Sequence, residues 1–238
     1  VLPVAAVNTN ASGVAAATSW TLGAMAGANT LTATAAPAGI SPNPVVFAAN
    51  GVPGGAGGLS ITTQPSATVI NGAVLTQAPV VQVLDVNGNP VATPTSVAIT
   101  VGIAAGPGGS LGGLTTVGTN ASGQASFNGL SITGLAGAYT LQFTSPGLTG
   151  VSSTGVNLTA GAPTQVAITT PPPATAQSGI AMAPATVVQL QDVSGNAVST
   201  SGTNIVAALV SGGGTLTGTL TVPTVAGGAS TFGNLILT

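Results

Sequence analysis

The sequence predicts an all-β protein, a row of β-sandwich units that repeat about every hundred residues. The stretch QAPVVQVLDVNGNPV returns as APATVVQLQDVSGNAV, so Asp85 and Asp192 occupy the same point of two copies, 192 − 85 = 107 residues apart. Ahead of the aspartate, Val81 and Val83 alternate with Gln82, which is typical of a half-buried strand running into a D-x-x-G-N turn. With 36 Gly and 17 Pro, the composition favours frequent turns over long helices.

The composition excludes several classes of protein. The 238 residues include no Lys, Arg, His or Cys and two acids, for a net charge of −2. Nucleic acids and anionic membrane surfaces are bound through Lys and Arg, so neither is an expected partner. The apolar runs are broken well before the ~18 residues that a membrane-spanning helix needs. Aromatic residues make up 3% of the chain, so the cores must consist mainly of Val, Leu, Ile and Ala.

Short β segments are predicted throughout the middle repeat, separated by turn signals. The expected strands lie near 59–63, 79–86, 96–102, 111–117, 124–132, 139–144 and 153–158. Alternating Val97, Ile99 and Val101, together with Leu141 and Phe143, mark faces that point into a core. Seven strands at this spacing favour an immunoglobulin-like (Ig-like) sandwich.

The repeats divide the chain into three units. TNASG at Thr9 returns at Thr119, an offset of 119 − 9 = 110. We expect the C-terminal part of one Ig-like repeat at 1–53, a complete repeat at 54–161 and the N-terminal part of another at 162–238. The connectors between them are short, so the units should form a semi-rigid string.

The two terminal units are expected to be incomplete. By the offsets, Val1 corresponds to position 111 of the middle unit and Thr238 to position 133. Two interpretations stay open. Either the chain is a segment of a longer array, or 24–51 of one subunit supplies the strands that 162–238 of a neighbouring subunit lacks, as in donor-strand polymerisation.

Several motifs in order resemble bacterial Ig-like repeats of the Big type. They are AITTxPxAT, VVQLxDxxGNxV, GGGTLxG, TNASGxASF and GxYTLxF, and they span nearly the whole chain. Such repeats build large invasin-like and intimin-like adhesins and other surface proteins. The resemblance implies an extracellular stalk or filament and names no ligand. The near-absence of charge differs from many repeats of this type.

The D-x-x-G-N segments carry the candidate metal ligands. Asp85, Asn87 and Asn89 have the spacing that begins a calcium loop, and Asp192 is the equivalent of Asp85 in the second copy. The alternative is a structural turn in which the aspartate accepts backbone N–H bonds. Ser194 replaces Asn87 in the second copy, and no bidentate glutamate follows either segment. The turn is therefore favoured and no metal or other cofactor is expected.

Catalysis is not expected. General acid–base chemistry needs titratable groups close together, and Asp85, Asp192 and Tyr139 are the available ones. The aspartates belong to successive units, so they cannot form a pair in an extended chain. Tyr139, in GAYTLQF, has the pattern of a tyrosine corner, and Trp20 is interpreted as packing within or between units.

Three segments match the acceptor pattern for N-linked sugar, at Asn10, Asn120 and Asn157. Asn10 and Asn120 are aligned copies, and the N-A-S-G they share is also favourable in a tight turn. Exposed Ser and Thr could instead carry O-linked sugar. Both possibilities stay open.

Together these observations predict a structural subunit of an extracellular filament, sheath or surface layer, or the stalk of an adhesin. Its expected partners are copies of itself, through polymerisation by strand exchange or through a longer array, with glycans as a further possibility. The alternative is an adhesion module that binds a glycan or protein through loops at one end of a sandwich. A cell-surface location follows from either.

Overall fold

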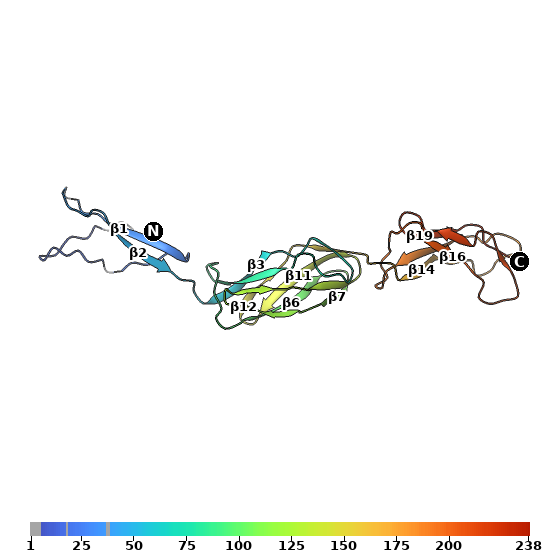
Figure 1. Ribbon diagram of the computed structural model, residues 1–238, viewed down its shortest axis with the longest axis horizontal. Coiled ribbons are helices and arrows are strands. Elements are labelled where there is room, and N and C mark those ends of the chain that lie inside the picture. The colour runs from blue at the N-terminus through green and yellow to red at the C-terminus, as the bar shows by residue number, and fades with distance from the viewer. Residues whose placement is uncertain (1–5, 18, 37–38) are drawn as a thin grey trace.

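The structure is a computed structural model that describes residues 6–17, 19–36 and 39–238. Val1, used above to place the first unit, lies outside them. The described residues form strands β1 to β20 and no helix, which confirms the all-β class. Three groups of strands follow one another along the long axis (Figure 1). No helix in the described ranges could cross a membrane, by either length or hydropathy.

The first group is a single hairpin. β1 (Gly27–Ala33) pairs antiparallel with β2 (Val45–Gly51), and within the described residues this sheet has only these two strands. Leu31 lies opposite Phe47, so the two side chains share one face of the hairpin. Phe47 is 50% exposed, because no second sheet covers that face.

The middle group is a complete sandwich with a closed core. Its strands are β3 (Ala56–Thr63), β4 (Thr68–Ile70), β5 (Val80–Asp85), β6 (Ala98–Ala105), β7 (Gly109–Gly112), β8 (Thr116–Gly118), β9 (Gln124–Ser126), β10 (Ser131–Gly134), β11 (Gly137–Ser145), β12 (Leu148–Ser152) and β13 (Val156–Thr159). β5 lies between β3 and β9, and β11 pairs with β13 near its start and with β6 and β12 further on. The rings of Phe127 and Phe143 meet in the core with centroids 5.0 Å apart.

Two strands expected from the sequence are each divided in the structure. The segment expected at 111–117 becomes β7 and β8, and the one at 124–132 becomes β9 and β10. Gly113 and Gly129, at φ +85° and +77°, break the extended backbone, and the halves then pair with different strands. β4 and β12 were not expected. β12 forms a hairpin with β11 after a turn that contains Gly147.

Strand β5 is more buried than the expected half-buried pattern. Gln82 is buried along with Val81 and Val83, because β5 has a neighbour on each edge. The Gln82 amide is satisfied inside the unit, where Nε2 donates to the carbonyl oxygens of Ser122 (3.0 Å) and Val83 (3.1 Å). Burial of this polar side chain is therefore compatible with its chemistry.

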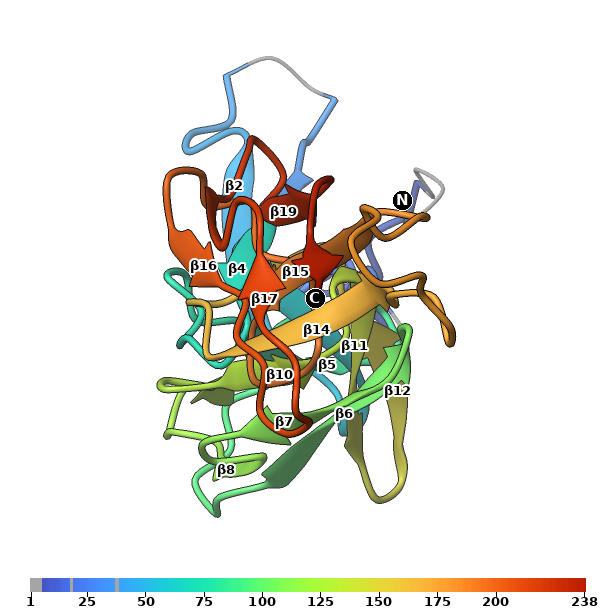
Figure 2. The ribbon, with the colours of Figure 1, turned by 90° about the vertical axis from the view of Figure 1, so that its right-hand side faces the viewer.

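The third group has fewer paired strands and a smaller core. Its strands are β14 (Gln165–Thr170), β15 (Thr186–Gln191), β16 (Asn204–Val206), β17 (Leu216–Thr217), β18 (Thr221–Pro223), β19 (Ala229–Phe232) and β20 (Ile236–Leu237). β15 lies between β14 and β19, as β5 lies between β3 and β9. Figure 2 looks along the molecule from this end, with β14, β16 and β17 facing the viewer. Its core cluster centres on buried Val188, Phe232 and Leu235.

Candidate functional site

The only two acidic side chains of the protein lie at the two places where one unit meets the next. Asp85 is 4% exposed and Asp192 is 1% exposed. Asp85 is the last residue of β5 and Asp192 directly follows β15, and each begins the D-x-x-G-N turn. Because burying a carboxylate is costly unless it is hydrogen-bonded, these two positions must have dedicated partners.

At the first joint, Asp85 organises both its own turn and the linker. Its Oδ1 accepts from the backbone N–H groups of Asn87 (2.9 Å) and Asn89 (2.8 Å), which closes the turn. Its Oδ2 accepts from the N–H of Gly54 and from the side-chain amide of Asn89, both at 2.8 Å. Gly88 supplies the positive φ, +84°, that the turn requires.

Asn89 then connects the middle unit to the first. Its Oδ1 accepts from the N–H of Ala26 and its Nδ2 donates to the carbonyl oxygen of Ala24, both at 2.8 Å. The amide thus pairs with the backbone just before β1 as a neighbouring strand would. Asp85 fixes the orientation of this amide by accepting its other N–H hydrogen.

The second joint repeats these contacts between the middle and third units. Asn196 accepts from the N–H of Ala136 (2.7 Å) and donates to the carbonyl of Gly134 (2.9 Å). Asp192 accepts from Gly161 (2.8 Å) and from the amide of Asn196 (3.0 Å). The partners correspond by the repeat offsets: 134 − 24 = 110, 136 − 26 = 110 and 161 − 54 = 107. The same joint is therefore built twice.

One additional side chain strengthens the second joint. Asn71 Nδ2 lies 2.8 Å from Asp192 Oδ2 and 2.9 Å from Ser194 Oγ, and Asn71 Oδ1 accepts from the N–H of Gly134 (2.9 Å). Asn71 precedes Gly72 in a tight turn of the middle unit, at φ +79° for the glycine. The second joint thus couples a turn, a linker and a strand end of the middle unit to one turn of the third.

The hydrogen bonds hold both carboxylates in the charged form. The side-chain amide of Asn89, with backbone N–H groups of Gly54, Asn89 and Asn87, lowers the pKa of Asp85 to about 2 against the opposing effect of burial. Burial acts strongly to raise the pKa of Asp192, but bonds from Gly161, Asn196 and Asn71 outweigh it and hold that pKa well below its ordinary value. The joints are therefore ionised at neutral pH.

Three of the four calcium candidates, Asp85, Asn89 and Asp192, use their side-chain oxygens for these contacts. Both oxygens of Asp85 accept two N–H hydrogens each, which occupies the lone pairs that a cation would use. Asp192 is satisfied in the same way, with Asn71 as a further donor. Asn87 is exposed. A metal ion would have to displace protein donors, and the described residues contain no group of three His, Cys, Asp or Glu that could hold one.

None of the remaining sequence candidates is hydrogen-bonded to Asp85 or Asp192 in the described residues. Asn10 and Asn120 accept identical pairs of backbone bonds, from residues two and four further along, as an N-A-S-G turn does. Asn157 is exposed on β13. Tyr139 is fully buried, and its hydroxyl lies 2.7 Å from the carbonyl oxygen of Leu135 and 2.6 Å from that of Gly108. Burial raises the pKa of Tyr139. Trp20 is half-buried.

The sequence reasoning identified the two turns and missed what they hold. Asn71, Gly54 and Gly161 were not singled out, and Asn196 was noted only as part of the repeated turn. A signal was present: the linker glycines recur at the 107-residue offset of the aspartates, and the segments TLGAMAGA and TGLAGA recur at the nearly equal offset of 110. Features that recur together at nearly equal offsets indicate a contact between repeats.

The match to a family model agrees with the fold of the middle unit. Residues 57–159, inside the unit expected at 54–161, match the family model described as SMCHD1 Ig-like domain 6. A solved structure of the Escherichia coli adhesin FdeC is 21% identical, covering 78% of this chain and 57% of that chain, with a TM-score of 0.36. The chain thus spans less than two thirds of that adhesin structure. No curated protein matches. The chain is all-β, and residues 57–159 belong to an immunoglobulin-like β-sandwich.

Proposed function

We propose that this chain is a structural subunit of an extracellular filament, sheath or surface layer, or of an adhesin stalk, in which Ig-like units are held end to end. The observation that carries the proposal is the repeated joint, with Asn89 and Asn196 making the same pair of contacts to the preceding unit. A joint that repeats its geometry places each unit on the next in the same way. Repetition of one placement produces an elongated object.

The joints restrain bending as well as position. At the second joint, one turn of the third unit is tied to three separate segments of the middle unit, through Asn71, Gly134 with Ala136, and Gly161. Bending at the linker would require all of these hydrogen bonds to break together. A string that resists bending is suited to projecting from a surface or to bearing load along its axis.

The uncharged surface supports a role within an assembly. The chain has no basic side chain, and both of its acids are buried in joints. Its surface therefore offers almost no charge repulsion to a second copy, and proteins with little charge tend to associate. Copies of the same chain are accordingly the proposed partners, and no catalytic role is proposed. Sugar on exposed Ser, Thr or Asn side chains would supply the solubility that charge does not.

Polymerisation by strand exchange between subunits is the finer form of this proposal. It accounts for a first unit reduced to one hairpin and a third unit with a small core, which stand at opposite ends of the molecule (Figure 1). A Big-type relationship, as the motifs suggest, is compatible with this role.

The proposal is tested on the source organism and on the purified chain. Immunogold labelling should place the protein outside the cell, and its deletion should remove a filament, sheath, layer or stalk visible by electron microscopy. The purified chain should appear as thin rods. Binding of monomeric chain to one glycan or protein through a sandwich end, with cell-surface ultrastructure unchanged by deletion, would instead support an adhesion module and overturn the structural role.

A further inference from the structure

The third unit has an open strand edge. The equivalent edge of the middle unit is paired with a strand of that same unit. In the middle unit, β6 pairs with β8 on one edge and with β11 on the other, where Leu141 lies opposite Ile103 and Phe143 opposite Val101. In the third unit, β16 pairs with β18, and no other described strand pairs with it. An edge of this kind presents unpaired backbone groups and can accept another strand.

The residues along this edge can be matched to β6 through shared hydrogen bonds. The N–H of Val97 donates to the Thr119 hydroxyl (2.9 Å), and the N–H of Thr203 donates to the Thr224 hydroxyl (3.1 Å). Val97 therefore corresponds to Thr203, an offset of 106. By the same offset Ala207, Ala208 and Leu209 correspond to Val101, Gly102 and Ile103.

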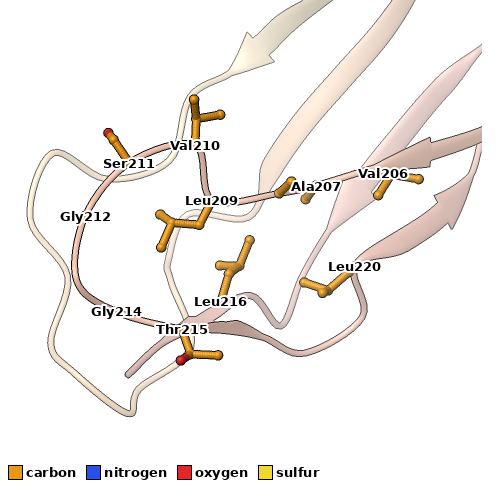
Figure 3. A pocket seen from close by; sticks show the side chains of 11 residues that line it. Val206, Ala207, Leu209, Val210, Ser211, Gly212, Gly214, Thr215, Leu216 and Leu220 are labelled. Carbon is orange, nitrogen blue, oxygen red and sulfur yellow. The ribbon is translucent and has the colours of Figure 1, made fainter.

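An apolar groove of about 560 Å³ lies beside this edge (Figure 3). Leu209, Leu216 and Leu220 face the same space, and glycines 212 and 214 line its rim. Gly106 corresponds to Gly212 by the offset of 106. A Cβ added at Gly106 would clash with the ring of Tyr139, which shows that this rim is where the β11 tyrosine packs in the complete unit. The groove of the third unit therefore lies where β11 packs in the middle unit.

Among the described strands, β1 has the character of β11. GANTLTA of β1 aligns with GAYTLQF of β11, and Gly27 pairs with Gly51 where Gly137 pairs with Leu158. Leu31 stands at the place of Leu141, on the parity that faces the core in β11. The same face of the hairpin carries exposed Val45 and Phe47. A lone hairpin is marginally stable in water, so this face needs a cover.

A second correspondence favours another copy of this chain as the source of that strand. Asn71 corresponds to Ser178, since both precede a glycine of positive φ, Gly72 or Gly179, whose N–H bonds the matching strand residue. Within the chain, Asn71 contacts Ser194. Between two copies, exposed Ser178 would meet exposed Asn87, the counterpart of Ser194. The Asn–Ser contact is preserved with the two residues exchanged.

We propose that the β1–β2 hairpin of one copy adds to the third unit of another, with β1 antiparallel to 206–210 in the register Leu31 opposite Leu209 and Ala33 opposite Ala207. This rests on the proposed structural role and gives it a geometry. The third unit of one copy and the hairpin of the other then form a composite unit. This unit is joined to the middle unit of the copy that supplies the hairpin through the contacts of Asp85 and Asn89 already present. Repeated head to tail along the molecule, a contact of this kind produces a filament.

One position of β1 fits the groove incompletely. Asn29 stands where β11 has Tyr139, so part of the groove beside glycines 212 and 214 stays unfilled. Asn29→Tyr should therefore tighten the association, because the ring would fill the space that Tyr139 fills in the middle unit. Asn87→Ala should weaken it, and the pair Asn87→Ser with Ser178→Asn, which copies the contact inside the chain, should restore it.

The register is tested by disulfide formation between two full-length variants, in a chain that has no cysteine of its own. Thr32 and Ala208 are both exposed, and they correspond to the directly paired residues Gln142 and Gly102. Thr32→Cys mixed with Ala208→Cys under mild oxidation should give a covalent heterodimer. Ala28→Cys mixed with Ala208→Cys is the control, because Ala28 lies four residues along the same face of β1.

Heterodimer yield at least tenfold above the control, increased by Asn29→Tyr, is the expected result. Yield equal to the control would overturn the proposal. That outcome leaves the structural role standing if electron microscopy still shows rods at the cell surface. If the cysteine variants cross-link but immunogold labelling places the protein inside the cell, the extracellular structural role is wrong and the strand exchange still holds.

Discussion

Asn196→Ala should loosen the joint between the middle and third units without unfolding either. The substitution removes the bonds from Ala136 N–H (2.7 Å) and to the carbonyl of Gly134 (2.9 Å), which both cross the joint, and one bond to Asp192 inside the turn. Gly161 donates to Asp192 and not to Asn196. The Gly161 amide therefore reports opening of the joint without losing its own acceptor.

The expected size follows from the two bonds that cross the joint. A neutral hydrogen bond contributes about 1 kcal/mol net, so the free energy of opening should fall by about 2 kcal/mol. Since each 1.4 kcal/mol is a factor of ten, hydrogen exchange at Gly161 should become about 30-fold faster. The amides of the β11 strand should keep their protection, because the core of the middle unit is unchanged.

Hydrogen exchange followed by NMR on the full chain makes this measurement, with Asn89→Ala as the matched control. Asn89 makes the same set of contacts at the first joint, so its loss should speed exchange at Ala26 and Gly54 and leave Gly161 unaffected. If Asn196→Ala changes the Gly161 rate no more than Asn89→Ala does, the two units are not coupled through this amide and the reasoning is wrong.

Three further predictions concern pH, calcium and the core. Because the pKa of Asp85 is lowered to about 2 from 3.8, and that of Asp192 is also lowered, the free energy of unfolding in urea should be level from neutral pH to about 4 and should decrease as the pH falls toward 2. Asp85→Asn with Asp192→Asn should flatten this decrease, and a decrease that begins above pH 5 would contradict the assignment. Calcium chloride or EDTA should shift the melting temperature by less than about 2 °C, since protein donors already occupy both carboxylates, and a larger rise with calcium would show a metal site. Tyr139→Phe should cost about 1–2 kcal/mol of unfolding free energy by leaving the Leu135 carbonyl without its hydroxyl donor, and unchanged stability would refute a structural role for that hydroxyl.

Local patterns carried most of the fold. Alternation around Val81 and the D-x-x-G-N turns identified the central strands, and the 107-residue spacing of the aspartates identified the repeat. The ends of the strands could be predicted less well from local patterns. Gly113 and Gly129 were expected inside continuous strands at 111–117 and 124–132, whereas each redirects the chain to a different strand partner.

The joints lay beyond local patterns because their partners are distant in sequence. Asn89 bonds Ala26 across 63 residues, and Asn71 bonds Asp192 across 121. The sequence of the turn predicts that the aspartate accepts backbone N–H bonds within the turn. It does not predict which linker or strand end donates the remaining hydrogen bonds. The partners of the Asn196 amide could not be predicted from its own turn either. Its partners follow only when the recurrence of the preceding unit at a matching offset is considered.

The central claim is that Asp–Asn joints hold successive units in one fixed placement. Residual dipolar couplings of the full chain in a weakly aligning medium test it most directly, by comparing the alignment of 54–161 with that of 162–238. One shared alignment tensor at neutral pH, resolved into two by Asn71→Ala with Asn196→Ala, is the predicted result. Two independent tensors in the unsubstituted chain would contradict the claim.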